Sequence, residues 1–450
     1  MLAPCTSFKV QVGIPIFGLG FTRGNQLLLC GGGGAGRSGV KNKLSSFKVD
    51  IRRKDLEEEA IYDISSDEDA PMCLAVHPKE NLAVAGINAS PESMKNGLNE
   101  NCRLFHIGET EFTLKKAVPC MESKNEDDYQ KVARFSKDGS LLATGTTDGM
   151  VHVFKYPTLE TVVKVQAVEN NDVLDVDIND EGAKLTAVTP GALKLISLRG
   201  RNIGTVIQTV SPLMVHKKHK LQFRAFRYGS GFTENLAFAV ANGIGKSKGS
   251  FIIVLDAHTL EIKKVQQASK KPITTFCLSP DGSVIGYGSA DFSISLLEAS
   301  TLRVLTQVKD AHGFSITSMA ISPDRRILVS GSADNTCRVV DLPLQFSPAS
   351  LNPLHTLLLA LAVAGVLLLF TTYFNMNDLR DVKDDTISIL PVSATTNTIV
   401  DYATTTTTTT TFTEAIAAAV PTDDQDKETA MPTQTTTVIA EESANFKEEL

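Results

Sequence analysis

The sequence has no tryptophan among its 450 residues and only seven cysteines. No Cys-x-x-Cys pair occurs and no histidine lies at metal-ligand spacing from two cysteines, which disfavours a disulfide framework or a structural zinc site. The N-terminal segment, MLAPCTSFKVQVGIPIFG, lacks a basic stretch followed by a continuous apolar stretch. No cleavable signal peptide is therefore predicted, and reduced thiols favour a cytosolic location for most of the chain.

An excess of basic charge is also missing, with 44 Lys and Arg against 51 Asp and Glu. The imbalance is local, because residues 375–450 hold four basic and fourteen acidic side chains. The remainder is close to neutral, which disfavours a nucleic-acid-binding protein with a basic body.

Charge disappears altogether between residues 342 and 377, and residues 354–374 read LHTLLLALAVAGVLLLFTTYF. A helix of this length measures about 31 Å, which matches the roughly 30 Å hydrocarbon core of a bilayer. A buried core helix of a globular protein seldom runs so far without a polar stripe. We therefore predict a transmembrane helix at 354–374, after a linker at 346–353.

The charges beside this segment do not decide its orientation, because only Arg338 lies near it on one side and only Arg380 and Lys383 on the other. The free thiols and the missing signal peptide favour a cytosolic body and a lumenal tail, a type II arrangement. The tail, residues 375–450, is acidic and contains eight consecutive threonines from Thr404 to Thr411. It is predicted to be disordered, either with O-linked sugars or as a plain acidic tail.

Residues 1–345 contain an internal repeat. FSKDGSLLATG begins at Phe135, LSPDGSVIGYG at Leu278 and ISPDRRILVSG at Ile321, and four weaker copies begin at Phe17, Leu74, Val176 and Phe226. Period-2 alternation of apolar residues between Gly- and Asp-rich turns predicts antiparallel sheet. Copies about 43 residues apart suit a four-stranded blade.

The spacing and the turn residues Asp148, Asp291 and Asp334 resemble the WD-repeat family. The predicted fold class is all-β, a seven-bladed WD-repeat-like β-propeller followed by one transmembrane helix and a disordered tail. Asp at these turns is expected to accept hydrogen bonds in a structural role. A strand at Ser7 to Val12 is expected to pair with the last blade and close the ring.

A glycine-rich segment, CGGGGAGRSGVKNK, follows the apolar run that ends at Cys30. It contains a formal G-x-G-x-x-G, but dinucleotide binding requires a helix next, and LSSFKVDI resumes strand-like alternation instead. Gly245-Lys246-Ser247 likewise imitates the end of a phosphate loop, although Val240 stands where that motif needs glycine. No Ser/His/Asp or Cys/His trio is evident, so no enzyme chemistry is predicted.

Two interpretations of the glycine loop remain open, a flexible blade insertion and a rigid loop around a cation. No carboxylate occurs between Gly31 and Lys43, which disfavours calcium or magnesium. Backbone carbonyls suit a potassium ion better. The candidate carbonyl ligands are Gly31, Gly32, Gly33, Gly34, Ala35, Gly36 and Gly39.

Several segments together resemble one known family: VGIPIFGLGF from Val12, GGGGAGRSGVKNKL from Gly31, DDYQKVARFSKDG from Asp127 and AHGFSITSMAISPD from Ala311. It is the family of endoplasmic-reticulum guanine nucleotide exchange factors that start COPII coat assembly, which includes the animal prolactin regulatory element-binding protein and its fungal counterparts. The glycine loop ending in Asn42-Lys43, in the first blade of an anchored propeller, is the most specific element.

The resemblance implies a cytosolic propeller whose glycine loop binds potassium and contacts a Sar-type small GTPase, releasing GDP without covalent chemistry. It also implies that Asn42, Val40 and Pro71 serve exchange, with Val40 standing where isoleucine is frequent. Lys41 and Arg37 depart from the family pattern. The alternative hypothesis is a membrane-tethered WD-repeat scaffold without exchange activity, while a DNA-binding role finds no basic face.

Overall fold

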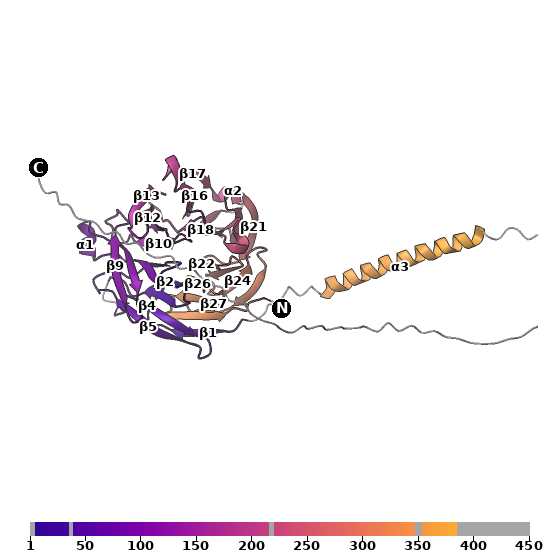
Figure 1. Ribbon diagram of the computed structural model, residues 1–450, viewed down its shortest axis with the longest axis horizontal. Coiled ribbons are helices and arrows are strands. Elements are labelled where there is room, and N and C mark those ends of the chain that lie inside the picture. Colours follow the sequence, from indigo (N-terminus) through magenta and orange to yellow (C-terminus); the bar gives the residue numbers. More distant parts are fainter. Residues whose placement is uncertain (1–4, 36–38, 216–219, 347–352, 385–450) are drawn as a thin grey trace, which may run out of the picture. The chain divides into compact units, whose positions relative to one another are not determined.

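A computed structural model describes residues 5–35, 39–215, 220–346 and 353–384 of the chain. Residues 5–346 hold seven four-stranded antiparallel sheets, each a blade of the propeller (Figure 1). The innermost strands are β2, β6, β10, β14, β18, β22 and β26. Each packs against the next and β26 packs against β2, so the blades form a closed ring. The predicted all-β, seven-bladed propeller is confirmed.

The blades run in chain order, each from its inner strand outwards. Blade one is β2 Ile16–Phe21, β3 Leu27–Gly31, β4 Lys43–Asp50 and β5 Asp55–Asp63. Blade two is β6 Cys73–Val76, β7 Leu82–Gly86, β8 Cys102–Ile107 and β9 Phe112–Val118. Blade three is β10 Gln130–Phe135, β11 Leu141–Thr146, β12 Met150–Lys155 and β13 Glu160–Gln166. Blade four is β14 Asp175–Ile178, β15 Lys184–Thr189, β16 Ala192–Ser197 and β17 Val206–Val210. Blade five is β18 Leu221–Tyr228, β19 Leu236–Gly243, β20 Ser250–Asp256 and β21 Ile262–Ser269. Blade six is β22 Ile273–Leu278, β23 Val284–Ser289, β24 Ile294–Glu298 and β25 Val304–Val308. The seventh is β26 Ile316–Ile321, β27 Ile327–Ser332, β28 Thr336–Asp341 and β1 Ser7–Gln11.

Short helices interrupt the loops at α1 Pro91–Lys95, η1 Gly200–Asn202, α2 Pro212–Val215 and η2 Gly231–Thr233. α1 begins with Pro91 in its first turn, and the Ser90 hydroxyl caps it by accepting a hydrogen bond from the Ser93 amide.

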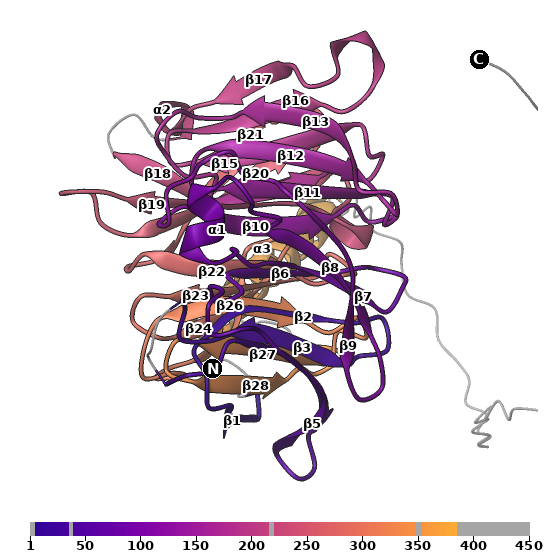
Figure 2. The same cartoon turned by 90° about the vertical axis from the view of Figure 1, so that its left-hand side faces the viewer.

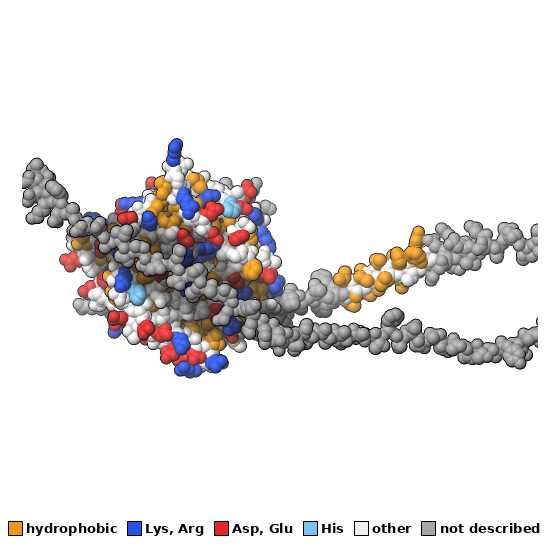
Figure 3. All heavy atoms as spheres, in the orientation of Figure 1, with side chains coloured by type: hydrophobic (Ala, Val, Ile, Leu, Met, Phe, Trp, Pro, Cys, Tyr) orange, Lys and Arg blue, Asp and Glu red, His pale blue; other side chains and the backbone are white. Residues whose placement is uncertain are grey.

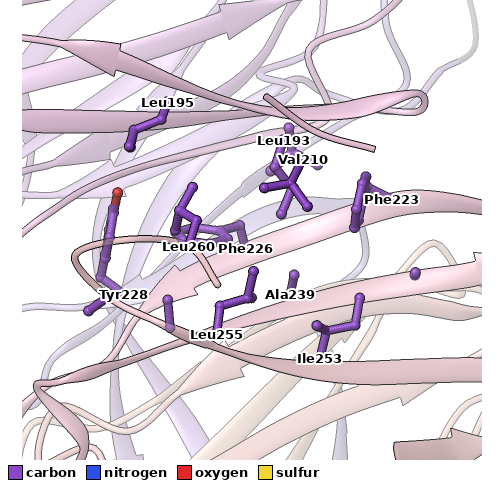
Figure 4. Packing of buried hydrophobic residues seen from close by; sticks show 14 of the residues in the cluster. Leu193, Leu195, Val210, Phe223, Phe226, Tyr228, Ala239, Ile253, Leu255 and Leu260 are labelled. Carbon is purple, nitrogen blue, oxygen red and sulfur yellow. The ribbon is translucent and has the colours of Figure 1, made fainter. Parts of the chain in front are cut away.

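The core lies between neighbouring blades. One cluster joins blades four and five, with Leu193 on β16, Phe223 on β18 and Ile253 on β20 (Figure 4). The second strand of each sheet is covered on both faces, which explains runs such as LLLCG in β3 instead of strict alternation. All seven cysteines are free and six are buried, as expected for small core residues.

The repeat turns are fixed by their aspartates. Asp291 accepts hydrogen bonds from the Ser289 hydroxyl and the Ser293 amide. Asp334 accepts from the Thr336 amide at 3.1 Å and the Gly313 amide at 2.6 Å. These contacts confirm the structural role expected of the turn aspartates.

The strand from the N-terminus closes the ring. β1 pairs antiparallel with β28, from Ser7 opposite Val340 to Gln11 opposite Thr336. Phe8 also packs against the core between the first and last blades. The predicted closing strand is confirmed.

The strand ends lie at two opposite faces, which Figure 2 shows from the side. The loops from the second to the third strand of each blade open at one face, called here the loop face. The turns from the first to the second strand lie at the other, called the turn face. Leu342, directly after β28, donates its amide to the Arg326 carbonyl at 2.7 Å and so lies at the turn face.

The last described element is α3, Pro353–Asp384, which begins one residue before the predicted span and ends ten residues after it. Residues Leu357–Phe374 have a mean hydropathy of 2.4 and contain no Asp, Glu, Lys or Arg. Figure 3 shows it covered by hydrophobic side chains. The Thr371 and Thr372 hydroxyls donate to carbonyls one turn earlier, both at 2.9 Å. α3 is therefore long and apolar enough to span a membrane. The disordered tail was predicted from residue 375, but residues 375–384 continue α3 as helix. The rest of the predicted tail, 385–450, and most of the predicted linker lie outside the described residues.

Candidate functional site

The glycine loop joins β3 to β4 in blade one and opens at the loop face. Gly31 is the last residue of β3 and Lys43 the first of β4, and the two pair directly. A strand and not a helix therefore follows the loop, which agrees with the prediction that it does not bind a dinucleotide. Gly36, one of the predicted carbonyl ligands, lies outside the described residues, as does Arg37.

Asn42 holds this loop from inside. Its side-chain oxygen accepts the Gly34 amide at 3.0 Å, and its side-chain nitrogen donates to the Gly34 carbonyl at 3.2 Å and the Glu68 carbonyl at 3.1 Å. Asn42 is only 4% exposed. The structure therefore makes Asn42 a positioning residue that shapes the loop.

The connection between blades one and two forms the other side of the site. The Asp69 carboxylate accepts the Ala35 amide at 3.2 Å, and the Asp69 amide is bound to the Asn88 carbonyl at 3.1 Å. Sequence reasoning missed Asp69, although the acidic run at residues 67–69 was a signal. The described part of the loop has no carboxylate, and Asp69 brings one to it from the connection to the next blade.

Two of the glycines are required by close contacts. A Cβ on Gly31 would lie 1.8 Å from the Pro15 carbonyl oxygen, and one on Gly32 would lie 2.2 Å from the Asn42 side-chain oxygen. Gly39 has a φ of +74° with open space around it. Gly31 and Gly32 therefore anchor the loop, while Gly39 provides a left-handed turn.

The outer part of the loop is accessible. Gly33, Ala35, Gly39 and Lys41 are exposed, and Val40 is half-buried against the core between blades one and seven. An incoming protein can reach these residues, which the exchange hypothesis requires.

Pro71 lies deeper than the loop. Its side chain is buried, and its carbonyl accepts a hydrogen bond from the Cys30 thiol at 3.4 Å. Burial raises the pKa of that thiol well above its usual value. Pro71 thus packs beneath the loop, and its role in exchange stays a prediction.

The oxygens around the loop suit an alkali cation better than zinc. The Gly34 and Glu68 carbonyls converge on one Asn42 nitrogen, and the Asp69 carboxylate lies beside them. Among the described residues no group of three or more His, Cys, Asp or Glu is placed to hold a metal. Carbonyl oxygens are ligands that potassium accepts, but the Gly34 and Glu68 carbonyls already accept hydrogen bonds from Asn42. The potassium ion therefore stays a prediction.

Positive charges next to the loop are neutralised locally. Lys43 pairs with Glu58 at 2.9 Å, and Arg103 pairs with Glu68 at 2.5 Å. The Glu68 backbone is also held by Asn42, so the second pair fixes one wall of the site. Lys41 contacts Asp63 at 3.2 Å but stays 75% exposed, a pair that contributes little stability.

Comparison with known proteins agrees with the repeat. The model of the WD domain, G-beta repeat, matches residues 128–155 and 303–341. A chain in the crystal structure of the mitotic checkpoint complex superposes with a TM-score of 0.57 at 14% identity, covering 76% of this chain and 97% of that one. Raptor from Chaetomium thermophilum gives 0.58 at 12% identity, covering 76% and 29%. These two structures show the fold alone.

The sequence relatives are more specific. SEC12-like protein 2 of Arabidopsis thaliana is 26% identical over 62% of this chain and 66% of its own length. The guanine nucleotide-exchange factor SEC12 of Candida glabrata is 25% identical over 75% of this chain and 72% of its own. The protein of the same name in Mus musculus is 23% identical over 64% and 76%. The chain is thus similar over most of its length to SEC12 guanine nucleotide-exchange factors, and this similarity, with the propeller, supports a place in their family.

Proposed function

We propose that this protein is a guanine nucleotide exchange factor that releases GDP from a Sar-type small GTPase at the endoplasmic-reticulum membrane and so starts COPII coat assembly. The observation that carries the proposal is the glycine loop, held by Asn42 and Asp69 and accessible at Gly33, Ala35 and Gly39. The relatives named guanine nucleotide-exchange factor support the activity. The GTPase class and the coat come from the resemblance.

The loop would act by differential binding. An exchange factor must bind the nucleotide-free GTPase more tightly than the loaded form, and by linkage the same difference weakens nucleotide affinity. A thousandfold weakening requires about 4 kcal/mol. A loop already ordered by three Asn42 hydrogen bonds loses little of that energy to ordering.

A potassium ion would stiffen the same loop. The carbonyls of Gly34 and Glu68 and the Asp69 carboxylate are the described groups suited to hold it, with the other loop carbonyls as further candidates. When bound, the ion would neutralise carbonyl repulsion inside the loop. Asn42 would keep these oxygens convergent whether or not the ion is present.

The apolar segment of α3 supports a membrane location. A propeller facing the cytosol as a type II protein would meet a GTPase bound to the same membrane surface. Confining both to two dimensions raises their effective concentration. The endoplasmic reticulum and this orientation belong to the proposal.

The test measures release of fluorescent GDP from a Sar-type GTPase by the full chain in liposomes. Wild type should accelerate release, Asn42→Ala should slow it at least about tenfold because the clamp is lost, and sodium in place of potassium should weaken it. Asn202→Ala, an exposed site in blade four, is the matched control and should match wild type.

The alternative, a scaffold without exchange activity, predicts the opposite results in this assay. A tethered WD-repeat scaffold would bind its partner equally in the GDP-bound and nucleotide-free states and would be indifferent to Asn42→Ala. No acceleration by the wild-type chain would rule out the exchange proposal.

A further inference from the structure

The centre of the propeller contains a cavity of about 540 Å³ that is lined by the inner strands of all seven blades. Its wall is charged mainly where blades three, four and five meet. Arg134 comes from β10, Arg224 and Arg227 from β18, and Asp175 from β14. This group is called here the channel cluster, and neither the glycine loop nor its exchange role uses it.

Most charges in and beside the channel cluster are paired. Arg227 binds the Asp175 carboxylate at 2.5 Å, and Asp175 also accepts the Phe226 amide at 3.1 Å. Lys131, further along β10, binds Asp172 at 2.5 Å. Asp175 and Asp172 are thus already engaged and leave the other arginines of the cluster without a close carboxylate.

Asp177, the other acidic residue near the cluster, does not neutralise the remaining arginines. Asp177, at 9% exposure, accepts the Tyr228 amide at 2.7 Å. Burial raises its pKa, against the opposing effect of Arg227 and Arg134. Asp177 is therefore a weaker counter-charge than a solvated carboxylate.

Two arginine groups stay unsatisfied. Within the described residues Arg224 has no hydrogen bond and no ion pair, although it lines the cavity. Arg134 reaches Asp175 only at 3.7 Å, and its buried Nε atom has no partner among the residues that the structure describes. The Arg134 side chain is still 35% exposed, so it can be reached from within the channel.

A guanidinium stays protonated at neutral pH, so Arg224 carries a positive charge that no described residue binds directly. Arg224 is only half-buried, so a solute in the channel can reach it. Burial lowers the pKa of Arg224, with the opposing attraction of Asp175 only a smaller effect, and burial also lowers the pKa of Arg134. Arg224 is thus a surplus charge facing a cavity that has room for a counter-ion.

We propose that the central channel binds a small oxyanion of the phosphate class between Arg224 and Arg134. Guanidinium groups offer planar pairs of N–H donors that match phosphate oxygens. The Arg224 guanidinium and the exposed part of the Arg134 side chain are the available donors. The volume admits a phosphate ester as well as free phosphate, and neither requires the glycine loop.

The experiment is isothermal titration calorimetry of the full chain in detergent with inorganic phosphate, pyrophosphate and succinate, at ionic strength matched with sodium chloride. Phosphate and pyrophosphate should bind saturably. Arg224→Gln should weaken both at least tenfold, and Arg52→Gln, an exposed arginine on blade one, should not change them. Binding by succinate as tight as by phosphate would overturn the phosphate class, and no saturable binding by wild type would overturn the site.

A second measurement needs no substitution. Phenylglyoxal modifies accessible arginines, and mass spectrometry identifies each modified residue. Phosphate should protect Arg224 and leave Arg52 unprotected; equal modification of Arg224 with and without phosphate would overturn the proposal even if Arg224→Gln failed to fold.

Discussion

The Asn42 side chain binds both the amide and the carbonyl of Gly34, at 3.0 and 3.2 Å. This reciprocal contact replaces the backbone pairing that β3 and β4 lose where the loop leaves them. One buried amide therefore sets the path of the exposed loop residues, and its effect should be measurable without any GTPase.

Asn42→Ala should loosen the loop. Removing the amide leaves the Gly34 amide and the Gly34 and Glu68 carbonyls without a partner, which costs about 1–3 kcal/mol. Hydrogen exchange followed by mass spectrometry should show faster exchange around Gly34 by at least about tenfold. Exchange in blade five serves as the internal control, and unchanged protection at Gly34 would mean that Asn42 does not hold the loop.

The glycines should differ in tolerance. Gly32→Ala places a methyl group on the Asn42 side chain and is expected to destabilise the fold by about 3 kcal/mol or more. Gly39→Ala meets open space and incurs only the backbone strain of about 1 kcal/mol. Chemical denaturation of the two variants tests this order. Equal stability losses would contradict the close approach at Gly32.

Deleting residues 1–11 should open the ring. The deletion removes β1, leaves β28 as an unpaired edge and exposes the core against which Phe8 packs. The thermal unfolding midpoint should fall sharply and aggregation should increase. A chain that lacks only residues 1–4 keeps β1 and is the control. An unchanged midpoint in the longer deletion would show that the seventh blade is stable with three strands.

Stability should fall as pH decreases from 6.5 towards 4. His312 is 4% exposed and contacts Ser330 and Thr336 at 2.8 and 3.0 Å. Burial lowers its pKa to about 4, against the opposing effect of Asp334. The unfolded chain therefore takes up the proton first, and the stabilisation present above pH 6.5 is lost as pH falls through this window.

Each such histidine adds about 1.4 kcal/mol per pH unit to the slope. His152, whose pKa burial also lowers to about 4, should contribute similarly. His312→Gln should roughly halve the change in unfolding free energy between pH 6 and 5. The same slope in wild type and variant would show that His312 titrates normally in the folded protein.

A charge in the middle of α3 should release the protein from membranes. Gly365→Arg places a guanidinium near the centre of Leu357–Phe374, which costs about 3 kcal/mol of insertion free energy. Carbonate extraction should then find more of the variant in the soluble fraction. Asn377→Arg lies beyond the apolar segment and should stay with the membrane. Equal extraction of both variants would argue against a spanning α3.

Short-range patterns account for the parts that could be predicted. The Asp-containing turns, the alternation in strands such as Leu221–Tyr228 and the uncharged run before Asp378 all reflect local backbone and solvation preferences. The closing role of Ser7–Gln11 also followed, because an unpaired edge strand needs a partner. The glycine loop was located from its composition, whereas Asn42 was singled out only by the resemblance to the exchange-factor family.

The sequence by itself determined the repeat, the number of blades, the apolar segment and the place of the loop, because these depend on residues close together in the chain. Only the tertiary structure decided that Asn42 faces inwards, that Asp69 reaches Ala35, and that Arg224 lines the channel without a partner among the described residues. Apart from the Asn42–Gly34 contact inside the loop, these relationships join segments from different parts of the ring. They depend on how the closed ring brings neighbouring blades together, which no local pattern encodes.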